Sequence, residues 1–566
     1  MGPAPKALLG IILAALLLHV PMVTAGPIAD DYIQRMALEQ PGAFGRMGPT
    51  GLFDFGNRAD FERDGHSLLP WFVGDDWRVR FLRPLASLEI ALQQRVFGSH
   101  EVPRHLVGLG VLAAVLAAAW RLFRGLGLSH RATSIAVCIL GFSDAAVLPV
   151  GWAANRSSAW CLLLVLLALD AAGRRAPLLA IVLACAATLF KESGLVAFPL
   201  IGLRHFGAGG PAHPRRMTFA AASAGLIGVY LVSYLGAGYG TTSAMYAAPW
   251  SAPLRFAGHL AVLCTAGVAS LAGPFPVDQA GLEPRTAWAV GLAGLTLVVC
   301  LVRAFHGDVR GHPATPVLIA VMLLALVPEA GAAPSDRLLW PATAGAAGLL
   351  GIALDRRLIR WPAASVRGRL LTAAVLLSAT LLSGLSTAGL GLLHRRLAAT
   401  TRAIAADSTL GNGARDVLIL QASNAYTAFV FPPMYAYAHN DREVRFQSLQ
   451  VGRQSLRMTR TGERSATFES EEPLLTGPFE RLYLTDLATT ALPVGAVRQA
   501  GGLRFEVLES GVDGPTRIGF SADRSLDAPD LLLAVQRGER FEALDPPGPG
   551  ESLDLVAPPP ALPLVP

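Results

Sequence analysis

Two adjacent carboxylates, Asp30 and Asp31, stand where the first hydrophobic segment of the chain ends. An aspartate in the hydrocarbon core costs roughly 2.5–3.5 kcal/mol on insertion scales, so the pair marks a membrane edge. A carboxylate at that depth has the chemistry of a general base for a substrate that itself lies in the membrane. The alternative is that the two side chains only end a membrane helix and solvate its end.

Cationic side chains near such a base would complete a site for sugar transfer from a lipid-linked phosphate. The acceptor hydroxyl needs a base, and the departing phosphate needs cations rather than a proton. Turns that we expect on the same side of the membrane contain further charged candidates for substrate binding: Arg83, Arg156, Lys191, Glu192, Asp336 and Arg337.

Four of these candidates also have simpler interpretations. Arg83 precedes Pro84 and would snorkel from a surface helix, whereas Arg156 would belong to an aromatic belt with a polar turn. Lys191 and Glu192 would neutralise each other. We favour function for this last pair, because arginine supplies almost all other positive charge in the chain.

Metal chemistry has little support in the sequence. His66, His100 and His105 lie on the same expected side as the carboxylates, but no two of them have the spacing of metal ligands. Asp144, inside the third apolar run, is either a buried polar partner or a residue of the site. The cysteines all lie in apolar segments and are typical of small buried hydrophobic residues. The sequence therefore assigns no cofactor and leaves a divalent metal open.

The composition indicates an integral membrane protein. Of the 566 residues, 52% are hydrophobic and 16% are charged, whereas soluble domains have about 25% charged residues. The mean hydropathy is +0.45. The net charge of +6 is scattered over short turns, which sets membrane orientation and offers no surface for nucleic acid. The arginine bias, with many Ala, Gly and Pro residues, is typical of a GC-rich bacterial genome.

Apolar runs predict about eleven membrane spans. They are residues 7–25, 105–120, 132–151, 158–173, 177–190, 193–203, 217–237, 286–302, 315–330, 338–354 and 370–393. Arginines gather in alternate turns, which the positive-inside rule places in the cytoplasm. The amino terminus is then cytoplasmic and the carboxyl-terminal region extracytoplasmic, in a cell inner membrane. Val23-Thr24-Ala25 resembles a signal cleavage site, but the long first run favours a retained span.

One apolar segment does not fit this threading. If residues 255–272 crossed the membrane, the arginines of residues 356–369 would lie outside. We therefore expect an interfacial or re-entrant helix that ends before Gly273. A chain of about twelve spans with an inside tail is the alternative.

The predicted fold class is mainly α: a polytopic membrane domain followed by a β-rich extracytoplasmic domain. The membrane domain would cover residues 1–393, with a first outer loop at 26–104 that includes an amphipathic surface helix after Arg83. Short β-rich runs at residues 417–420, 481–484, 503–507 and 531–535 predict the second domain, residues 394–545. The Pro-rich end, residues 546–566, is expected to be unstructured.

Several stretches together resemble the GT-C superfamily of multispanning glycosyltransferases that use lipid-phosphate sugars. The nearest likeness is to the branch of protein O-mannosyltransferases and tetratricopeptide-bearing mannosyltransferases. The similar stretches are Ala29-Asp30-Asp31-Tyr32, residues 81–88, His105-Leu106-Val107, Trp152-Ala153-Ala154-Asn155-Arg156, residues 189–193 and residues 335–341.

The resemblance implies roles for these positions. The Asp pair would hold the catalytic base, and Arg337 with Lys191 would hold the lipid phosphate. The chain departs from the tetratricopeptide branch at Ser143-Asp144 and Leu148, where that branch has His-Pro and Glu, and it carries no tetratricopeptide repeats.

The sequence thus favours a glycosyltransferase that moves a mannose-like sugar from a polyprenyl-phosphate carrier to an extracytoplasmic protein or glycan acceptor. A transporter or flippase for a lipid-linked sugar is the main alternative, although transporters usually have matched halves with polar groups at mid-membrane. A glycan ligase and an assembly scaffold also stay open.

Overall fold

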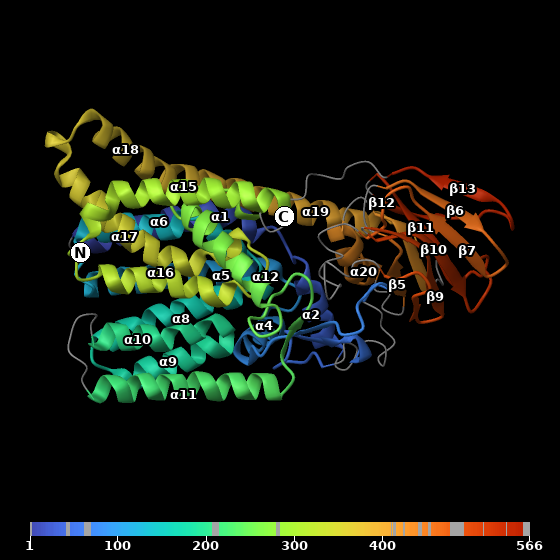
Figure 1. Ribbon diagram of the computed structural model, residues 1–566, viewed down its shortest axis with the longest axis horizontal. Helices are drawn as coiled ribbons and strands as arrows, with labels where there is room; N and C mark the ends of the chain where they lie inside the picture. The colour runs from blue at the N-terminus through green and yellow to red at the C-terminus, as the bar shows by residue number, and fades with distance from the viewer. Residues whose placement is uncertain are drawn as a thin grey trace.

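The computed structural model consists of a helical bundle and a β-rich C-terminal domain, with the predicted first outer loop between them (Figure 1). It describes the chain except residues 1–2, 41–45, 61–68, 207–213, 279–283, 409, 411–414, 423–424, 440–443, 451–453, 476–491, 513, 539 and 558–566. The prediction of a mainly helical protein with a β-rich C-terminal region is confirmed.

A helix lies at each predicted span. The bundle consists of α1 (Pro3–Val23), α5 (Glu101–Gly125), α6 (His130–Phe142), α8 (Arg156–Gly173), α9 (Pro177–Phe190), α10 (Ala197–Phe206), α11 (Pro214–Gly236), α15 (Pro284–Val309), α16 (Thr315–Glu329), α17 (Trp340–Ile359), α18 (Val366–Leu377) and α19 (Ser383–Asp407). The described chain has 6 helices that are long and apolar enough to cross a membrane, or up to 7 when α6 and the bent segment after it count as one span. The protein is therefore a multi-pass membrane protein, and the number of crossings stays a prediction.

The segment that did not fit the threading is helical but short. It consists of α12 (Pro253–Val262), a π-helical turn and α13 (Val268–Ser270). No residue of α12 is buried in the protein, and the segment is not among the candidate spans. Its predicted interfacial or re-entrant position remains a prediction.

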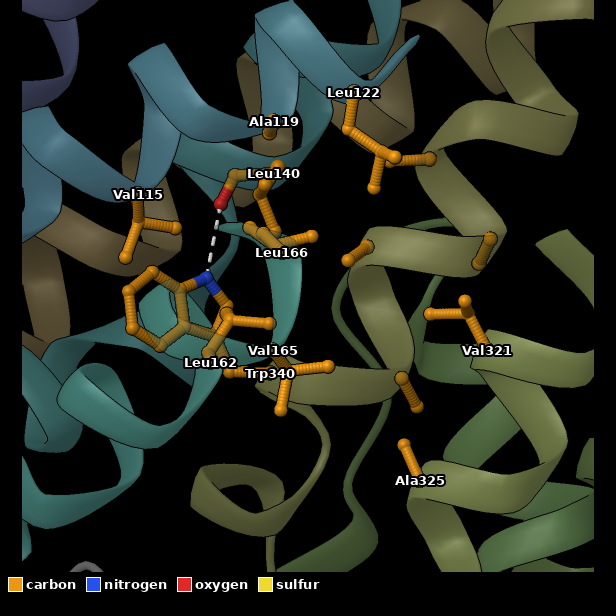
Figure 2. Close-up of a cluster of buried hydrophobic side chains, with 14 of the residues drawn as sticks. Val115, Ala119, Leu122, Leu140, Leu162, Val165, Leu166, Val321, Ala325 and Trp340 are labelled. Carbon is orange, nitrogen blue, oxygen red and sulfur yellow. Dashed lines mark hydrogen bonds between the residues drawn. The ribbon is translucent and has the colours of Figure 1, made fainter. Parts of the chain in front are cut away.

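Close packing of helices fixes the bundle core. Glycines on α17 let it approach its neighbours, since a Cβ at Gly345 would stand 2.4 Å from the carbonyl oxygen of Leu318 on α16. Trp340, at the start of α17, is fully buried. Its indole Nε1 donates to the carbonyl oxygen of Leu140 on α6 at 3.1 Å, within an otherwise apolar cluster (Figure 2). This contact fixes the first turn of α17, just after the turn that carries Arg337.

The first outer loop folds into helices and a small sheet. Its elements are α2 (Asp30–Glu39), β1 (Asp54–Asn57), β2 (Arg78–Arg80) and α4 (Pro84–Phe97). β2 also pairs with β3 (Gly240–Thr242), so the loop after α11 joins the first outer loop. The expected amphipathic helix is α4, with Pro84 in its first turn and Leu88, Leu92 and Val96 exposed along one face.

The C-terminal domain contains two sheets and the helix α20 (Ala425–His439). One sheet has the order β12 (Arg540–Leu544), β11 (Leu531–Arg537), β4 (Asp416–Gln421), β5 (Arg445–Ser448). The other has the order β13 (Ser552–Leu555), β6 (Leu456–Arg460), β7 (Ser465–Glu469), β10 (Gly514–Ala522), β9 (Leu503–Gly511), β8 (Val497–Ala500). β11, β4 and β5 are parallel, and α20 connects β4 to β5.

Three of the four predicted β runs are strands, and the run at 481–484 lies outside the described residues. The expectation of an unstructured end after residue 545 is wrong at β13, which pairs with β6. The pairing is favourable because it buries Leu555 in the domain core. α19 continues through the predicted domain boundary at residue 393 and leads directly into the C-terminal domain.

Candidate functional site

The predicted base lies at the start of α2, which follows a sharp turn after α1. Ala29, at the N-cap, has φ +43°, a conformation that alanine rarely adopts. This turn places Asp30 and Asp31 in the first helical turn, where negative charge is favourable. The two carboxylates then have different surroundings.

Asp31 is held by the backbone. Its Oδ2 accepts from the N–H of Ile28 at 3.0 Å, and its Oδ1 accepts from the N–H of Ala154 at 3.0 Å. Burial raises the pKa of Asp31, while the two N–H groups and the charges of Arg104 and Arg156 oppose that rise. Both oxygens are occupied, so this side chain joins α2 to the turn before α8.

Asp30 is half-buried and accepts no hydrogen bond from any residue that the structure describes. Burial raises the pKa of Asp30 to about 6, and the negative charge of Asp31 acts in the same direction. The positive charge of Arg337 opposes them. A carboxylate with a pKa near 6 and a free oxygen suits a general base that works near neutral pH.

Arg337 lies in the turn before α17, half-buried. Its guanidinium stacks over the ring of Trp152 at 5.4 Å. Within the described part of the chain, no carboxylate lies within salt-bridge distance of Arg337 and no acceptor binds its N–H groups. The planar fork of N–H donors is therefore available to an anion, and it matches the geometry of a phosphate.

Tyr246, which sequence reasoning missed, lies close to Asp30 and Arg337. Its ring contacts that of Phe81 at 5.6 Å. Burial raises the pKa of the Tyr246 phenol, on which the charges of Arg337 and Asp30 also act. A β-bridge between Tyr246 and Ala332 ties its loop to the segment that leads to Arg337. We call Asp30, Trp152, Tyr246 and Arg337 the Asp30–Arg337 cluster.

Arg83 and Glu192 form an ion pair beside this cluster. The guanidinium Nη2 and Nε of Arg83 donate to Oε2 of Glu192 at 2.8 Å and 2.9 Å. The Arg83 guanidinium also stacks on Phe81 at 4.4 Å. The two predicted substrate-binding residues thus bind each other and connect the first outer loop to the turn after α9.

Lys191 points away from its neighbour Glu192. Its Nζ donates to both carboxylate oxygens of Glu329, at 2.8 Å and 2.9 Å, and to Oγ of Ser158 at 3.0 Å. Three contacts use all the donors of an ammonium group. Lys191 is 8% exposed and Glu329 4%, so this lysine, for which the resemblance implied phosphate binding, is occupied by an internal carboxylate.

Arg156 is also enclosed by protein, at 1% exposure. Its Nη1 donates to Oε1 of Gln93 at 2.9 Å and lies 3.5 Å from Oε1 of Glu89. The same Glu89 oxygen accepts from the indole of Trp160. Arg156, at the start of α8, thus binds two side chains of α4, and it lies next to Asp31.

Asp336 lies beside other carboxylates rather than cations. Its N–H donates to Oδ1 of Asp278 at 2.9 Å. Burial, followed by the negative charges of Asp278 and Asp144, raises the pKa of Asp336 well above its usual range. Asp144 itself accepts from Ser386 at 2.8 Å. Among the described residues, no group of three or more His, Cys, Asp or Glu side chains has the arrangement of a metal site.

The structure therefore brings two predicted residues, Asp30 and Arg337, within electrostatic range of each other. The other predicted residues surround the pair in contacts with protein groups. Sequence reasoning also missed Glu329, the partner of Lys191. The one signal for it was a lone acidic residue at the end of a long apolar run.

Comparisons with known proteins find likeness only at the level of solved structures. No protein-family model matches the chain, and no curated protein sequence matches it. ArnT from Cupriavidus metallidurans, bound to undecaprenyl phosphate, aligns at 13% identity and TM-score 0.40 over 79% of this chain and 90% of that chain. The Archaeoglobus fulgidus oligosaccharyltransferase, tethered with an acceptor peptide, aligns at 10% identity and TM-score 0.41 over 78% of this chain and 63% of that chain.

Proposed function

We propose that this chain is a GT-C-type glycosyltransferase that moves a sugar from a polyprenyl-phosphate carrier to an acceptor hydroxyl. One observation carries the proposal. A half-buried carboxylate without a hydrogen-bond partner and a guanidinium without a carboxylate partner, both among the described residues, belong to one cluster. These are the two groups that such a transfer requires, a base and an anion-binding cation.

In this mechanism, Asp30 accepts the proton of the acceptor hydroxyl as its oxygen attacks the anomeric carbon of the sugar. The bond between that carbon and the phosphate oxygen breaks, and the carrier phosphate leaves with an additional negative charge. The guanidinium of Arg337 stabilises this charge through paired N–H donors. A single displacement inverts the configuration at the anomeric carbon.

Five of the other predicted residues have positioning roles in this proposal. Asp31 and Arg156 fix α2 and α4 against the start of α8. Lys191 holds Glu329 at the end of α16, which begins the loop that leads to Arg337. Arg83 and Glu192 connect this arrangement to the first outer loop.

The positive-inside rule supports an orientation in which the cluster and the C-terminal domain face outward. The acceptor would then be an extracytoplasmic protein or cell-envelope glycan, and a mannose-like hexose is the sugar that the sequence resemblance favours. Undecaprenyl phosphate, the lipid in the ArnT structure, is a carrier of the class that this proposal needs.

The direct test is transfer by the purified full chain in lipid nanodiscs from radiolabelled polyprenyl-phosphate hexoses. Mass analysis of envelope glycans and glycoproteins, with and without the gene, would identify the acceptor to supply. We expect label in the acceptor and release of polyprenyl phosphate in equal amounts. Movement of the lipid-linked sugar across sealed vesicles without any glycosylated product would contradict the proposal and indicate a flippase.

A further inference from the structure

The helix that carries Asp30 is enclosed partly by the C-terminal domain. Tyr32, on the first turn of α2, is buried in the same apolar cluster as Phe431 and Phe541 of that domain. In Figure 1, α2 lies between the helical bundle and α20. The domain therefore packs directly against the helix that holds the proposed base.

Tyr437, on α20, makes three contacts along one face of α2. Its ring meets that of Tyr32 edge-on, with centroids 5.9 Å apart. The guanidinium of Arg35 lies over the same ring at 5.3 Å. The hydroxyl of Tyr437 donates to Oε1 of Glu39 at 2.6 Å. These α2 residues are three and four positions apart, so one tyrosine contacts α2 along its length.

α2 also packs against the first outer loop and the bundle. Met36 and Ala37 belong to a cluster that contains Leu52 of that loop, Ala154 before α8 and Ala436 of α20. The helix has 10 residues, which is too short to be stable in water without tertiary contacts. The position of α2, and therefore the orientation of the Asp30 side chain, depends on contacts with the C-terminal domain and with the rest of the protein.

A second contact joins the domain to the first outer loop at a distance from α2 in sequence. The ring of Trp71 stacks on that of Phe505 at 5.1 Å, and its Nε1 donates to the carbonyl oxygen of Leu449 at 3.1 Å. Gln447 donates to the carbonyl oxygen of Leu69 at 3.1 Å. The loop thus remains attached to the domain even when the Tyr437 contact is altered.

We propose that the C-terminal domain is part of the transferase site, and that Tyr437 is a positioning residue that holds α2 so that Asp30 faces Arg337. The inference rests on the proposed function and adds a residue and a domain to it. It predicts that changes at Tyr437, which lies outside the Asp30–Arg337 cluster, alter the chemical step rather than donor binding.

The test compares Tyr437→Ala with the wild-type full chain in nanodiscs. We expect kcat to fall on the order of 10- to 100-fold, since small misplacement of a catalytic group has effects of this size. The KM for the lipid donor should not change. A less tightly held α2 should also admit water, which lowers the pKa of Asp30. The pH at which half of the activity is lost should therefore fall below about 6, the value that burial and the charges of Asp31 and Arg337 set in the wild type.

Phe468→Leu is the matched control. Phe468 is fully buried in the six-stranded sheet and belongs to a cluster separate from that of Tyr32. The control should lower thermal stability and leave kcat and the pH profile unchanged. If it moved the pH profile as far as Tyr437→Ala does, general destabilisation would explain both and the proposal would be overturned.

If Tyr437→Ala does not fold, two more conservative variants test the same inference. Tyr437→Phe removes the hydrogen bond to Glu39 and keeps the ring contacts, so it should lower kcat a few-fold. Glu39→Ala removes that bond and also the one that Oε1 of Glu39 accepts from Gln94 at 3.2 Å, so it should lower kcat at least as far. Adding Tyr437→Phe to Glu39→Ala should lower kcat no further. Wild-type rates in both single variants, or additive losses in the double variant, would overturn the inference. The proposed function would stand in that case if Asp30→Asn remained inactive. A wild type without transfer would instead overturn the proposed function.

Discussion

The two ends of the helical bundle use the same residue types in different ways. At the end away from the C-terminal domain, several arginines have aspartate partners. Arg357 and Arg360 bind the buried Asp308 at 2.7 Å and 3.1 Å, and Arg121 binds Asp170 at 2.8 Å. At the domain-facing end, Asp30 and Arg337 lack such partners among the described residues.

This difference indicates which charged side chains lack a protein partner and are available to a substrate. Buried polar groups are normally paired, because an unpaired one has a desolvation cost of about 1–3 kcal/mol or more. At the far end, the internal ion pairs of Asp308 and Asp170 follow that rule. At the domain-facing end, Lys191, Glu192 and Arg83 have internal partners, whereas Asp30 and Arg337 have none among the described residues.

The largest effect should come from Asp30→Asn, which keeps the size of the side chain and removes the base. Transfer should fall on the order of 10²- to 10⁴-fold. The measurement is the initial rate of transfer from labelled donor. Asp31→Asn is the matched control, and it should act mainly on thermal stability because Asp31 accepts two backbone N–H groups. The reverse ranking of the two variants would assign the base to Asp31.

Removal of the cation should be the next largest effect. Arg337→Ala should lower kcat/KM on the order of 10²-fold, which is the usual effect of losing one group that stabilises developing negative charge. Arg337→Lys should recover only part of the rate, since an ammonium keeps the charge but neither the paired N–H donors nor the planar stack on Trp152. Equal rates for Arg337→Lys and wild type would show that charge alone suffices.

The Lys191–Glu329 pair should matter for stability. Lys191→Met leaves the carboxylate of Glu329 buried and unpaired, with an expected loss of about 3–5 kcal/mol in the free energy of unfolding. Lys191→Met with Glu329→Met should recover most of that loss. Thermal unfolding in nanodiscs measures both. A Lys191→Met variant that is as stable as wild type but no longer binds polyprenyl phosphate would return Lys191 to the phosphate site.

Sequence reasoning located the helices and two residues of the cluster because those depend on local pattern. Hydropathy placed a helix at every predicted span, and the turn composition placed Asp30 and Arg337 on one side of the membrane. The partner of Lys191 was missed for a backbone reason. Lys191 is extended, with φ −157° and ψ 142°, so it and Glu192 point to different neighbours.

Tyr246 and the C-terminal contacts could not have been predicted from local pattern. Tyr246 reaches the cluster through a single β-bridge to Ala332, which joins loops far apart in the chain. Tyr437 lies on a helix with two internal prolines, Pro432 and Pro433, which disfavour helix in sequence analysis. Packing of α20 on α2 overrides that preference. Contacts between distant segments leave no periodic signal in either one.

The pH dependence of transfer should show the raised pKa of Asp30. Transfer needs the deprotonated carboxylate, so the rate should fall about tenfold for each pH unit below about 6. Because the folded pKa lies above the usual 3.8, Asp30 favours the fold most at pH values below 3.8, and this contribution is lost as pH rises through about 6. Asp30→Asn should therefore be more stable than wild type at neutral pH, as thermal unfolding would show.

The smallest effect should come from the far end of the bundle, with Arg357→Ala. Asp308 keeps Arg360 as a partner at 3.1 Å, so the charge of its carboxylate stays compensated. We expect a loss of about 1–3 kcal/mol in the free energy of unfolding, because Arg357 also stacks on Phe305 at 4.3 Å, and no change in transfer rate. Thermal unfolding and the transfer assay on the same preparation measure both. A large loss of transfer without a loss of stability would mean that the far end takes part in the reaction, and the contrast between the two ends would no longer identify the site.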